Sequence, residues 1–407
     1  MFELTNKQRE YLGLDPIPST WDKEILKGDT YRPESLLYFE GDILKRHISS
    51  TDEQYKEVQY QELTKERSIL LPKTSRGKEK KLTGSVLESR QPIGVYFTAN
   101  CYDDIFIGNH TSQTTFYSSH WDNAHKEKGQ DRLNINDVIE KFIGESSEGH
   151  ISEITTFKQL KRKNIKYKSG DIFSFKISRD EYAFGRILLD IHSLRKKNVI
   201  PPKHDFYSLM GSALLVDVYA HISKNKEVDI EELLQKPRLP SDYMMDNVIF
   251  YGEYEIIGHQ PLKEEDFHFP ISYGHTLNGR PTVYLQWGLI HIEKPLKKYN
   301  KYLLAENERL PIGHPSRSIN NPYSYRSIGF RPTFYYEDIK KAMDNNGRFQ
   351  FNTAVHYSAK FDLRNPANTE IKNDILNAFA LDPKRDYDYN RKITKTMSTI
   401  DLLKLME

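Results

Sequence analysis

The segment that comes closest to a catalytic pattern is His120-Trp121-Asp122-Asn123-Ala124-His125, which places two histidines and a carboxylate close together. His110 lies ten residues upstream, so the set offers ligands for a divalent metal in a hydrolase. A catalytic zinc or iron site needs three such ligands around one open position. Nothing in the sequence places these residues on one face of a helix, and a polar loop is the simpler interpretation.

Other catalytic patterns are weaker. The sequence contains no GxGxxG, GxxxxGK[ST], HExxH, GxSxG or CxxC motif, which removes the usual signatures of nucleotide-binding proteins, zinc proteases and hydrolases. Three histidines lie near two aspartates in the central region, but their spacing does not place them on a common face for acid-base catalysis. These residues are His192, His204, His221, Asp190 and Asp217. We therefore predict that the protein is not an enzyme and has no cofactor.

Residues 167–190, YKSGDIFSFKISRDEYAFGRILLD, combine a Gly-Asp turn with two alternating strands. Aromatic and aliphatic side chains alternate along the first strand, a reverse turn follows at residues 178–181, and the second strand alternates again. This pattern predicts a half-buried β-hairpin. Ala183 and Gly185 lie on its other face, where small residues let another backbone or a partner approach closely.

Asp171 and Arg186 are the two charged residues of this hairpin that could pair with each other or bind a ligand. They lie at its beginning and near its end, so an ion pair across the hairpin is one interpretation. Because the same strand carries Tyr182 and Phe184, Arg186 is as readily stacked within the sheet as offered to a ligand. Both interpretations remain open from the sequence.

The hairpin resembles the core of the immunity-protein-26 family, domains of bacterial polymorphic toxin systems. That family opens with a Gly-Asp-apolar-aromatic strand, continues into a Tyr/Trp-x-Phe-Gly-Arg-apolar strand and often closes with an Ile-Gly-x-x-Pro-Leu turn. The matching residues are Gly170, Asp171, Ile172 and Phe173, then Tyr182, Phe184, Gly185, Arg186 and Ile187, then Ile257, Gly258, Pro261 and Leu262. The resemblance covers about residues 165–290, so the chain looks like a long form with N- and C-terminal extensions.

The resemblance implies a non-catalytic immunity protein that binds a cognate toxin domain and neutralises it by occlusion. A tight interface of this kind needs aromatic and arginine anchors. The expected partner-binding residues are Tyr167, Asp171, Tyr182, Arg186 and Asp190, with Phe173, Phe184 and Trp287 as further candidates. Because a wholly buried side chain cannot contact a toxin, we expect the phenylalanines to be core residues and Asp171, Arg186 and Asp190 to be exposed.

Composition narrows the class of partner. The chain has 59 Lys and Arg against 57 Asp and Glu, a formal charge of +2, so no strong field attracts nucleic acid or a membrane surface. The single cysteine, Cys101, excludes an intramolecular disulfide framework. No signal-peptide pattern is present and no run approaches the roughly 18 apolar residues that span a bilayer. We expect a cytoplasmic protein.

At 407 residues the chain is long enough for more than one domain. We predict an α+β N-terminal module at 1–128, a helical linker at 129–163, the β-rich domain that resembles the immunity family at 164–293, and a loop plus helical C-terminal extension at 294–407. The fold class is α+β, with a curved antiparallel sheet in the centre, a β-rich N-terminal module and a mainly helical C-terminus. Local patterns also predict an N-terminal helix with a Thr5–Gln8 capping box, a short helix at 229–234, and strands at 249–257 and 282–292.

Two other functions stay open beside the immunity function. One is the metal-dependent hydrolase that would use His110, His120, Asp122 and His125. The other is a non-enzymatic interaction scaffold in bacterial defence, in which the flanking regions recruit other proteins.

Overall fold

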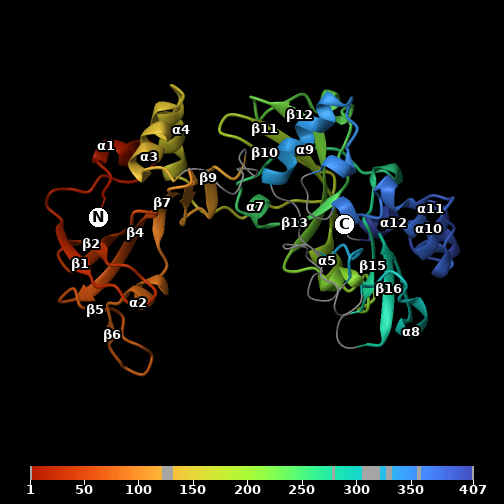
Figure 1. Cartoon of the computed structure of the whole chain (residues 1–407), viewed down its shortest axis with the longest axis horizontal. Helices are drawn as coiled ribbons and strands as arrows, with labels where there is room; N and C mark the ends of the chain where they lie inside the picture. The colour runs from red at the N-terminus through yellow and green to blue at the C-terminus, as the bar shows by residue number, and fades with distance from the viewer. Residues whose placement is uncertain are drawn as a thin grey trace. The chain divides into compact units, whose positions relative to one another are not determined.

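The computed structural model describes residues 2–121, 132–276, 280–304, 321–326, 332–354 and 359–405 (Figure 1). Its contacts divide the chain into two compact units. The first is Met1–Ile165 with Tyr251–Glu253, and the second is Lys166–Phe250 with Tyr254–Glu407. These two units do not coincide with the four segments predicted from the sequence, and those segment boundaries stay a prediction.

The first unit is built on one antiparallel sheet in the order β1-β2-β3-β4-β7-β8-β9, with two short strands, β5 and β6, continuing from β4. Its strands are β1 (Asp22–Leu26), β2 (Ser35–Glu40), β3 (Ile43–Ser50), β4 (Gln54–Lys65), β5 (Ile69–Leu70), β6 (Lys80–Lys81), β7 (Ile93–Asn100), β8 (Ile105–Asn109) and β9 (Thr114–Ser118). Burial alternates along β3 and β7, as expected for strands with one face on a core.

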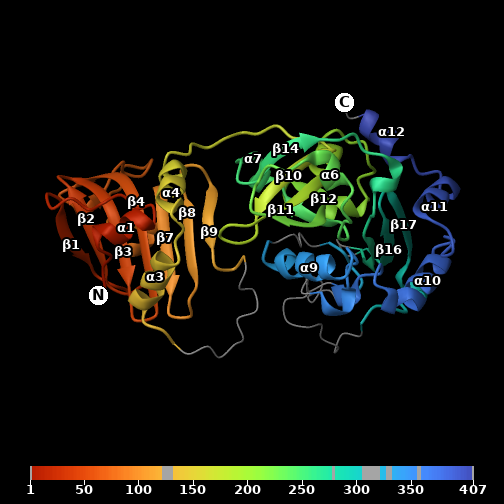
Figure 2. The ribbon, with the colours of Figure 1, turned by 90° about the horizontal axis from the view of Figure 1, so that it is seen from above.

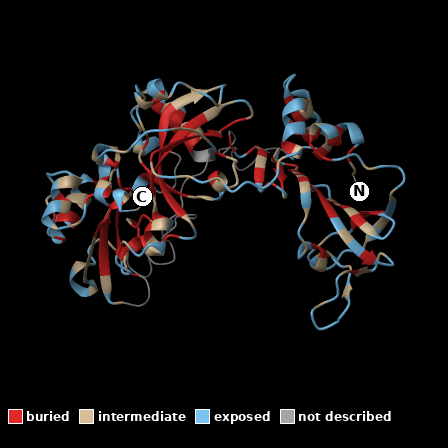
Figure 3. Ribbon diagram, turned by 180° about the vertical axis from the view of Figure 1, so that it is seen from behind, coloured by how far each residue is buried: buried red, intermediate tan, exposed pale blue. Residues whose placement is uncertain are grey.

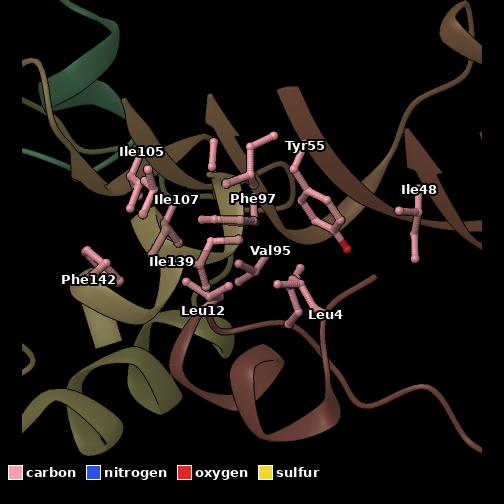
Figure 4. Packing of buried hydrophobic residues seen from close by; sticks show 14 of the residues in the cluster. Leu4, Leu12, Ile48, Tyr55, Val95, Phe97, Ile105, Ile107, Ile139 and Phe142 are labelled. Atoms are coloured by element: carbon pink, nitrogen blue, oxygen red, sulfur yellow. The ribbon is translucent and has the colours of Figure 1, made fainter. Parts of the chain in front are cut away.

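Helices of the first unit cover one face of this sheet. They are α1 (Asn6–Tyr11), α3 (Ile135–Gly144) and α4 (His150–Lys158), and a further short helix, α2 (Gly84–Glu88), lies elsewhere in the unit. The predicted capping box of Thr5 and Gln8 starts α1. Figure 4 shows Leu4 and Leu12, on either side of α1, meeting apolar side chains of α3 and of the strands in the core between them. The helices expected between residues 129 and 163 are therefore present, and they pack in the core of this unit.

The second unit contains a five-stranded antiparallel sheet in the order β13-β12-β11-β10-β14. Its strands are β10 (Asp171–Lys176), β11 (Tyr182–Asp190), β12 (Ala213–Ser223), β13 (Asp242–Met245) and β14 (Glu255–His259). The predicted hairpin is β10 and β11, paired with Phe173 opposite Gly185. Irregularities in register between β10 and β14 and between β11 and β12 bend the strands, which gives the sheet its curvature.

Both faces of this hairpin are buried, so the prediction that it is half-buried is wrong (Figure 3). Phe173 and Phe175 belong to the core on one face, whereas Ile172 and Phe184 belong to a second cluster on the other. The small residue Gly185 is needed inside the sheet, because an added Cβ would lie 2.4 Å from the Phe173 ring.

The two faces of the five-stranded sheet are covered by helices from different parts of the chain. One face is covered by α9 (Pro332–Asp344), which contacts β12 and contributes Tyr335, Ile339 and Ala342 to the core (Figure 2). The other face is covered by α6 (Ile230–Leu234), the short helix predicted at 229–234, whose N-cap Asp229 accepts a hydrogen bond from the Glu232 backbone N–H. A helix of the predicted C-terminal extension is thus part of the central core.

A three-stranded antiparallel sheet follows in the chain, formed by β15 (Ile271–His275), β16 (Thr282–Trp287) and β17 (Ile290–Pro295). The single strand expected at 282–292 is therefore wrong, because a turn at Gly288 divides it into two. Gly288 has φ +57°, and an added Cβ would lie 2.5 Å from the Phe269 ring. The strand expected at 249–257 is also shorter, since its first part is helix α7 (Asn247–Phe250).

Short helices complete the second unit. They are α5 (Ile191–Lys196), α8 (Leu296–Tyr299), α10 (Thr369–Ala378), α11 (Tyr387–Ile393) and α12 (Thr399–Lys404), with 3-10 turns at η1 (Asp205–Ser208), η2 (Glu264–Asp266), η4 (Phe351–Thr353), η5 (Ala359–Phe361) and η6 (Pro366–Asn368). With its antiparallel sheets and helical C-terminal part, the structure confirms the predicted α+β class. Among the described residues, no helix has the length and apolar character needed to cross a membrane.

Candidate partner-binding site

Asp171 is held inside the fold at the start of β10. One carboxylate oxygen lies 2.8 Å from His259 Nδ1 on β14, and the other accepts the Lys168 backbone N–H at 2.9 Å. The side chain is buried, and Arg186 is not its partner. The expected ion pair between Asp171 and Arg186 is wrong, because Asp171 pairs with His259 and Arg186 pairs with Asp266.

Arg186 is also buried, with 3% of its surface exposed. Its guanidinium donates hydrogen bonds to the backbone carbonyls of Gln260 at 2.9 Å and Pro261 at 3.1 Å. A second guanidinium nitrogen lies 3.3 Å from an Asp266 carboxylate oxygen. The expectation that Asp171 and Arg186 are exposed is therefore wrong: Asp171 binds His259 at the end of β14, and Arg186 fixes the segment after β14 to the sheet.

The other expected partner-binding residues are partly exposed. Asp190 caps α5 by accepting the Ser193 backbone N–H at 2.9 Å. The Tyr167 hydroxyl donates to Asp246 at 2.8 Å, and burial raises the pKa of Tyr167. Tyr182 lies at the start of β11 with the Lys176 ammonium near its ring. Their contact with a partner stays a prediction.

Arg186 belongs to a network of four buried or half-buried charged groups. Arg238 joins it by binding Asp217 at 2.7 Å and Asp266 at 3.3 Å. Burial raises the pKa of the Asp217 carboxyl to about 6, while the guanidinium groups of Arg238 and Arg186 oppose this shift. The network connects the centre of the sheet to the 260–266 segment, and through Arg238 it reaches a cleft.

This cleft has a volume of about 1000 Å³ and lies wholly within the second unit. Its lining comes from residues 238–240, 264–271, 349–351 and 383–388, with Trp287, Arg364, Lys372 and Leu376. Segments far apart in the chain therefore form one concave surface. Such a surface, with aromatic walls and a few polar groups, is typical of binding sites.

Aromatic rings form the apolar part of the cleft. The Phe267 and Phe269 rings stack at 5.4 Å, and the Tyr387 ring contacts both Phe269 at 5.0 Å and Trp287 at 5.5 Å. The Tyr387 hydroxyl accepts the Leu289 backbone N–H at 3.0 Å, and burial raises its pKa to about 12. The hydroxyl therefore stays neutral and the ring is fixed in place.

Arg364 joins two walls of the cleft. Its guanidinium forms a two-pronged contact with Asp362, at 3.0 and 2.7 Å, and donates to the backbone carbonyls of Ser241 at 2.9 Å and His268 at 3.1 Å. Such a fork of hydrogen bonds holds a fixed geometry. The segment around residue 364 is thus attached to the segments at 241 and 268.

Sequence reasoning identified only Trp287 among the residues that line this cleft. Two short segments of the lining, Phe267-His268-Phe269 and Arg385-Asp386-Tyr387, combine aromatic rings with polar or charged side chains. This combination is the signal that could have indicated a binding surface. Neither short segment shows that it meets the other, because more than one hundred residues separate them in the chain.

Of the four residues of the alternative hydrolase site, the structure describes His110 and His120. The His110 ring stacks on Tyr96 at 4.0 Å, and His120 is exposed. Asp122 and His125 lie outside the described residues. In the part of the chain that the structure describes, no group of three or more His, Cys, Asp or Glu side chains is arranged to hold a metal ion.

When the chain is compared with known protein families, its central part matches one of them. No curated protein and no solved structure gives a match. The family model described as Immunity protein 26 matches residues 168–279. This range includes the whole five-stranded sheet and the cleft residues from 238 to 271, whereas α9 to α12 lie beyond it. The resemblance predicted from the β10–β11 hairpin is therefore confirmed: residues 168–279 match the Immunity protein 26 family, and the regions before and after them are extensions outside the match.

Proposed function

We propose that this protein is an immunity protein that binds a cognate bacterial toxin domain and neutralises it by occlusion. The observation that carries the proposal is the match of residues 168–279 to Immunity protein 26, which supports an immunity function and indicates a non-catalytic role. The residues that prompted the resemblance, Asp171 and Arg186, form the buried framework of that domain. Their structural use agrees with a protein whose task is to present a rigid surface.

The proposal assigns two roles to the predicted partner-binding residues. Tyr167, Tyr182 and Asp190 are partly exposed and are proposed to contact the toxin directly. Asp171 and Arg186 are buried and are proposed to act through the backbone that they hold. Rigid surfaces lose little conformational entropy on binding, which favours tight neutralisation.

The test uses a toxin domain encoded beside this chain's gene, produced in a bacterial host with and without the full-length protein. We expect growth only when both are present, and a one-to-one complex of the purified proteins by size-exclusion chromatography with light scattering. An unrelated toxin domain is the control. Binding without growth rescue would favour the scaffold function instead, and toxicity with no binding would contradict the proposal.

The same purified protein allows a check of the hydrolase alternative. Metal content by mass spectrometry and hydrolysis of phosphoester and peptide substrates would be measured on the complex and on the free protein. We expect neutralisation to persist after treatment with a chelator, because occlusion requires contact and not chemistry. Loss of growth rescue in a variant lacking only His110 and His120 would support the alternative.

A further inference from the structure

The cleft lined by Phe267, Phe269, Trp287 and Tyr387 carries charged side chains that form no ion pair within the described part of the chain. Lys372 on α10 and Arg385 before α11 have no ion-pair partner among the described residues. The Arg385 guanidinium lies 4.7 Å from the centroid of the Tyr389 ring. Cations left unpaired beside an aromatic surface are candidates for binding an acidic group of another molecule.

Carboxylates face the same cleft from the family-matched segment. Glu264 accepts the Ile400 backbone N–H at 3.3 Å, and neither Glu264 nor Glu265 has an ion-pair partner in the described part of the chain. Among the described residues, the cations without an ion pair therefore come from the C-terminal extension, and the segment 264–265 supplies two carboxylates without an ion pair. Asp386, which caps α11 by accepting the Tyr389 backbone N–H at 2.9 Å, is a further carboxylate of the lining and lies beside Arg385. The cleft thus carries both signs of charge around an apolar centre.

An exposed apolar strip continues from Arg385 along α11. Tyr389 is 38% exposed and Ile393 is 48% exposed. Their spacing of four residues places them on one side of the helix, and Arg385 lies four residues before Tyr389. Large apolar side chains grouped on a surface mark interaction sites. The strip extends the area available to a protein partner beyond the cleft itself.

The walls of the cleft are held in place by hydrogen bonds and ion pairs, which favours binding of a partner there. Arg364 binds the backbone at Ser241 and His268, and Arg238 is held by Asp217 and Asp266. These hydrogen bonds fix the lining before any partner arrives, so little ordering is needed on binding. A rigid pocket with aromatic anchors is the arrangement in which a few side chains supply most of the binding energy.

We propose that the toxin docks here: a protruding segment of the toxin inserts a large apolar side chain among the aromatic rings, with an acidic group against Lys372 and Arg385 and a basic group against Glu264 and Glu265. This inference rests on the proposed function and names the surface that performs it. It also assigns a task to the C-terminal extension, which supplies one half of the binding surface.

The experiment uses the full-length chain and the toxin domain encoded beside its gene. The double variant Lys372→Glu with Arg385→Glu reverses two charges of the cleft, and neither residue forms an ion pair in the part of the chain that the structure describes. The matched control is Lys196→Glu with Lys203→Glu, two exposed lysines outside the cleft. We expect the cleft variant to bind the toxin at least 30-fold more weakly and to lose growth rescue, and the control to change affinity less than threefold.

Hydrogen-deuterium exchange on the wild-type complex gives an independent readout. We expect protection within 262–271 and 383–393, and circular dichroism should show that both charge variants are folded. Equal affinity of the cleft and control variants, or protection confined to β14 or to the first unit, would overturn the inference while leaving the immunity function intact. Failure of the wild-type chain to bind the toxin would overturn the proposed function, and this inference with it.

Discussion

Each unit buries arginines beside carboxylates, and in the second unit one arginine of this network also lines a cleft. In the first unit, Arg9 and Arg46 both contact Glu57, at 2.9 and 3.1 Å, and Tyr55 donates its hydroxyl to the same carboxylate. All of these groups are buried among α1, β3 and β4. In the second unit, Arg238 belongs to the buried network and also lines the cleft.

The units also differ in how their sheets are covered. In the first, α1, α3 and α4 come from the chain on either side of the strands they cover. In the second, α9 begins more than one hundred residues after β12, which it contacts. In the first unit, α1 also contacts α3 and α4, for example through Gln8 and Glu140, so both units need contacts between distant segments. The units differ in what these segments form, because only in the second do they close a core and also line the cleft described above. Four predictions test this comparison.

The largest effect is expected from Glu57→Gln, which would leave two buried guanidinium groups without a carboxylate. Breaking a buried charge cluster in this way costs about 3–5 kcal/mol in the free energy of unfolding. Denaturant unfolding followed by the fluorescence of Trp21 and Trp121, both in the first unit, measures the loss. The control Glu53→Gln removes an exposed pair with Arg132 and should cost at most about 1 kcal/mol.

A smaller loss is expected from Ile339→Ala on α9. Ile339 is fully buried in the core of the five-stranded sheet, and truncation to alanine leaves a cavity that costs about 3 kcal/mol. Met343→Ala, on the same helix and 42% exposed, should change stability by less than about 0.5 kcal/mol. Equal melting temperatures for the two variants would show that the extension does not complete the central core.

Arg186→Met tests whether the arginine network of the second unit holds the lining of the cleft in place. The substitution removes hydrogen bonds to the carbonyls of Gln260 and Pro261, so we expect a loss of about 2 kcal/mol in stability. Faster amide exchange should be confined to the 260–266 segment and the cleft lining. Arg186→Lys keeps the charge but not the fork and should give an intermediate effect. Unchanged exchange at 260–266 would remove the link between this network and the cleft.

The smallest expected effect is a pH dependence from His204, which is 2% exposed. Its Nδ1 accepts the Phe206 backbone N–H at 3.2 Å, and burial, with a smaller effect from His291, lowers its pKa to about 3. An unfolded histidine has a pKa of about 6.5. Between these values the unfolded chain binds a proton that the folded chain does not, so stability falls as the pH decreases from about 6.5 toward 3.

His204→Asn keeps an acceptor for the Phe206 N–H and removes the titration. We expect this variant to lose about 1 kcal/mol less stability than the wild type between pH 7 and pH 5.5, measured as the difference between unfolding free energies at the two pH values. The exposed His192→Asn is the matched control. Parallel pH profiles for wild type and His204→Asn would show that this buried histidine does not carry the effect.

Local patterns in the sequence were sufficient for the elements that local forces build. Thr5 and Gln8 predicted the capping box of α1, and Asp229 predicted the start of α6, because a cap involves only neighbouring residues. The alternation from 171 to 190 predicted the β10–β11 hairpin, since side chains alternate along any strand. The family resemblance followed from the same short pattern, and the family match confirms it.

Tertiary structure decided which of those residues are accessible and what lies beside them. Alternation cannot tell a half-buried sheet from one covered on both faces, so Asp171 and Arg186 were expected at the surface although both are buried. The cleft was beyond local reasoning because its walls come from segments near 240, 266, 350 and 385. Only the packing of these segments brings the aromatic rings and the unpaired charges together, and short-range periodicity carries no information about such distant contacts.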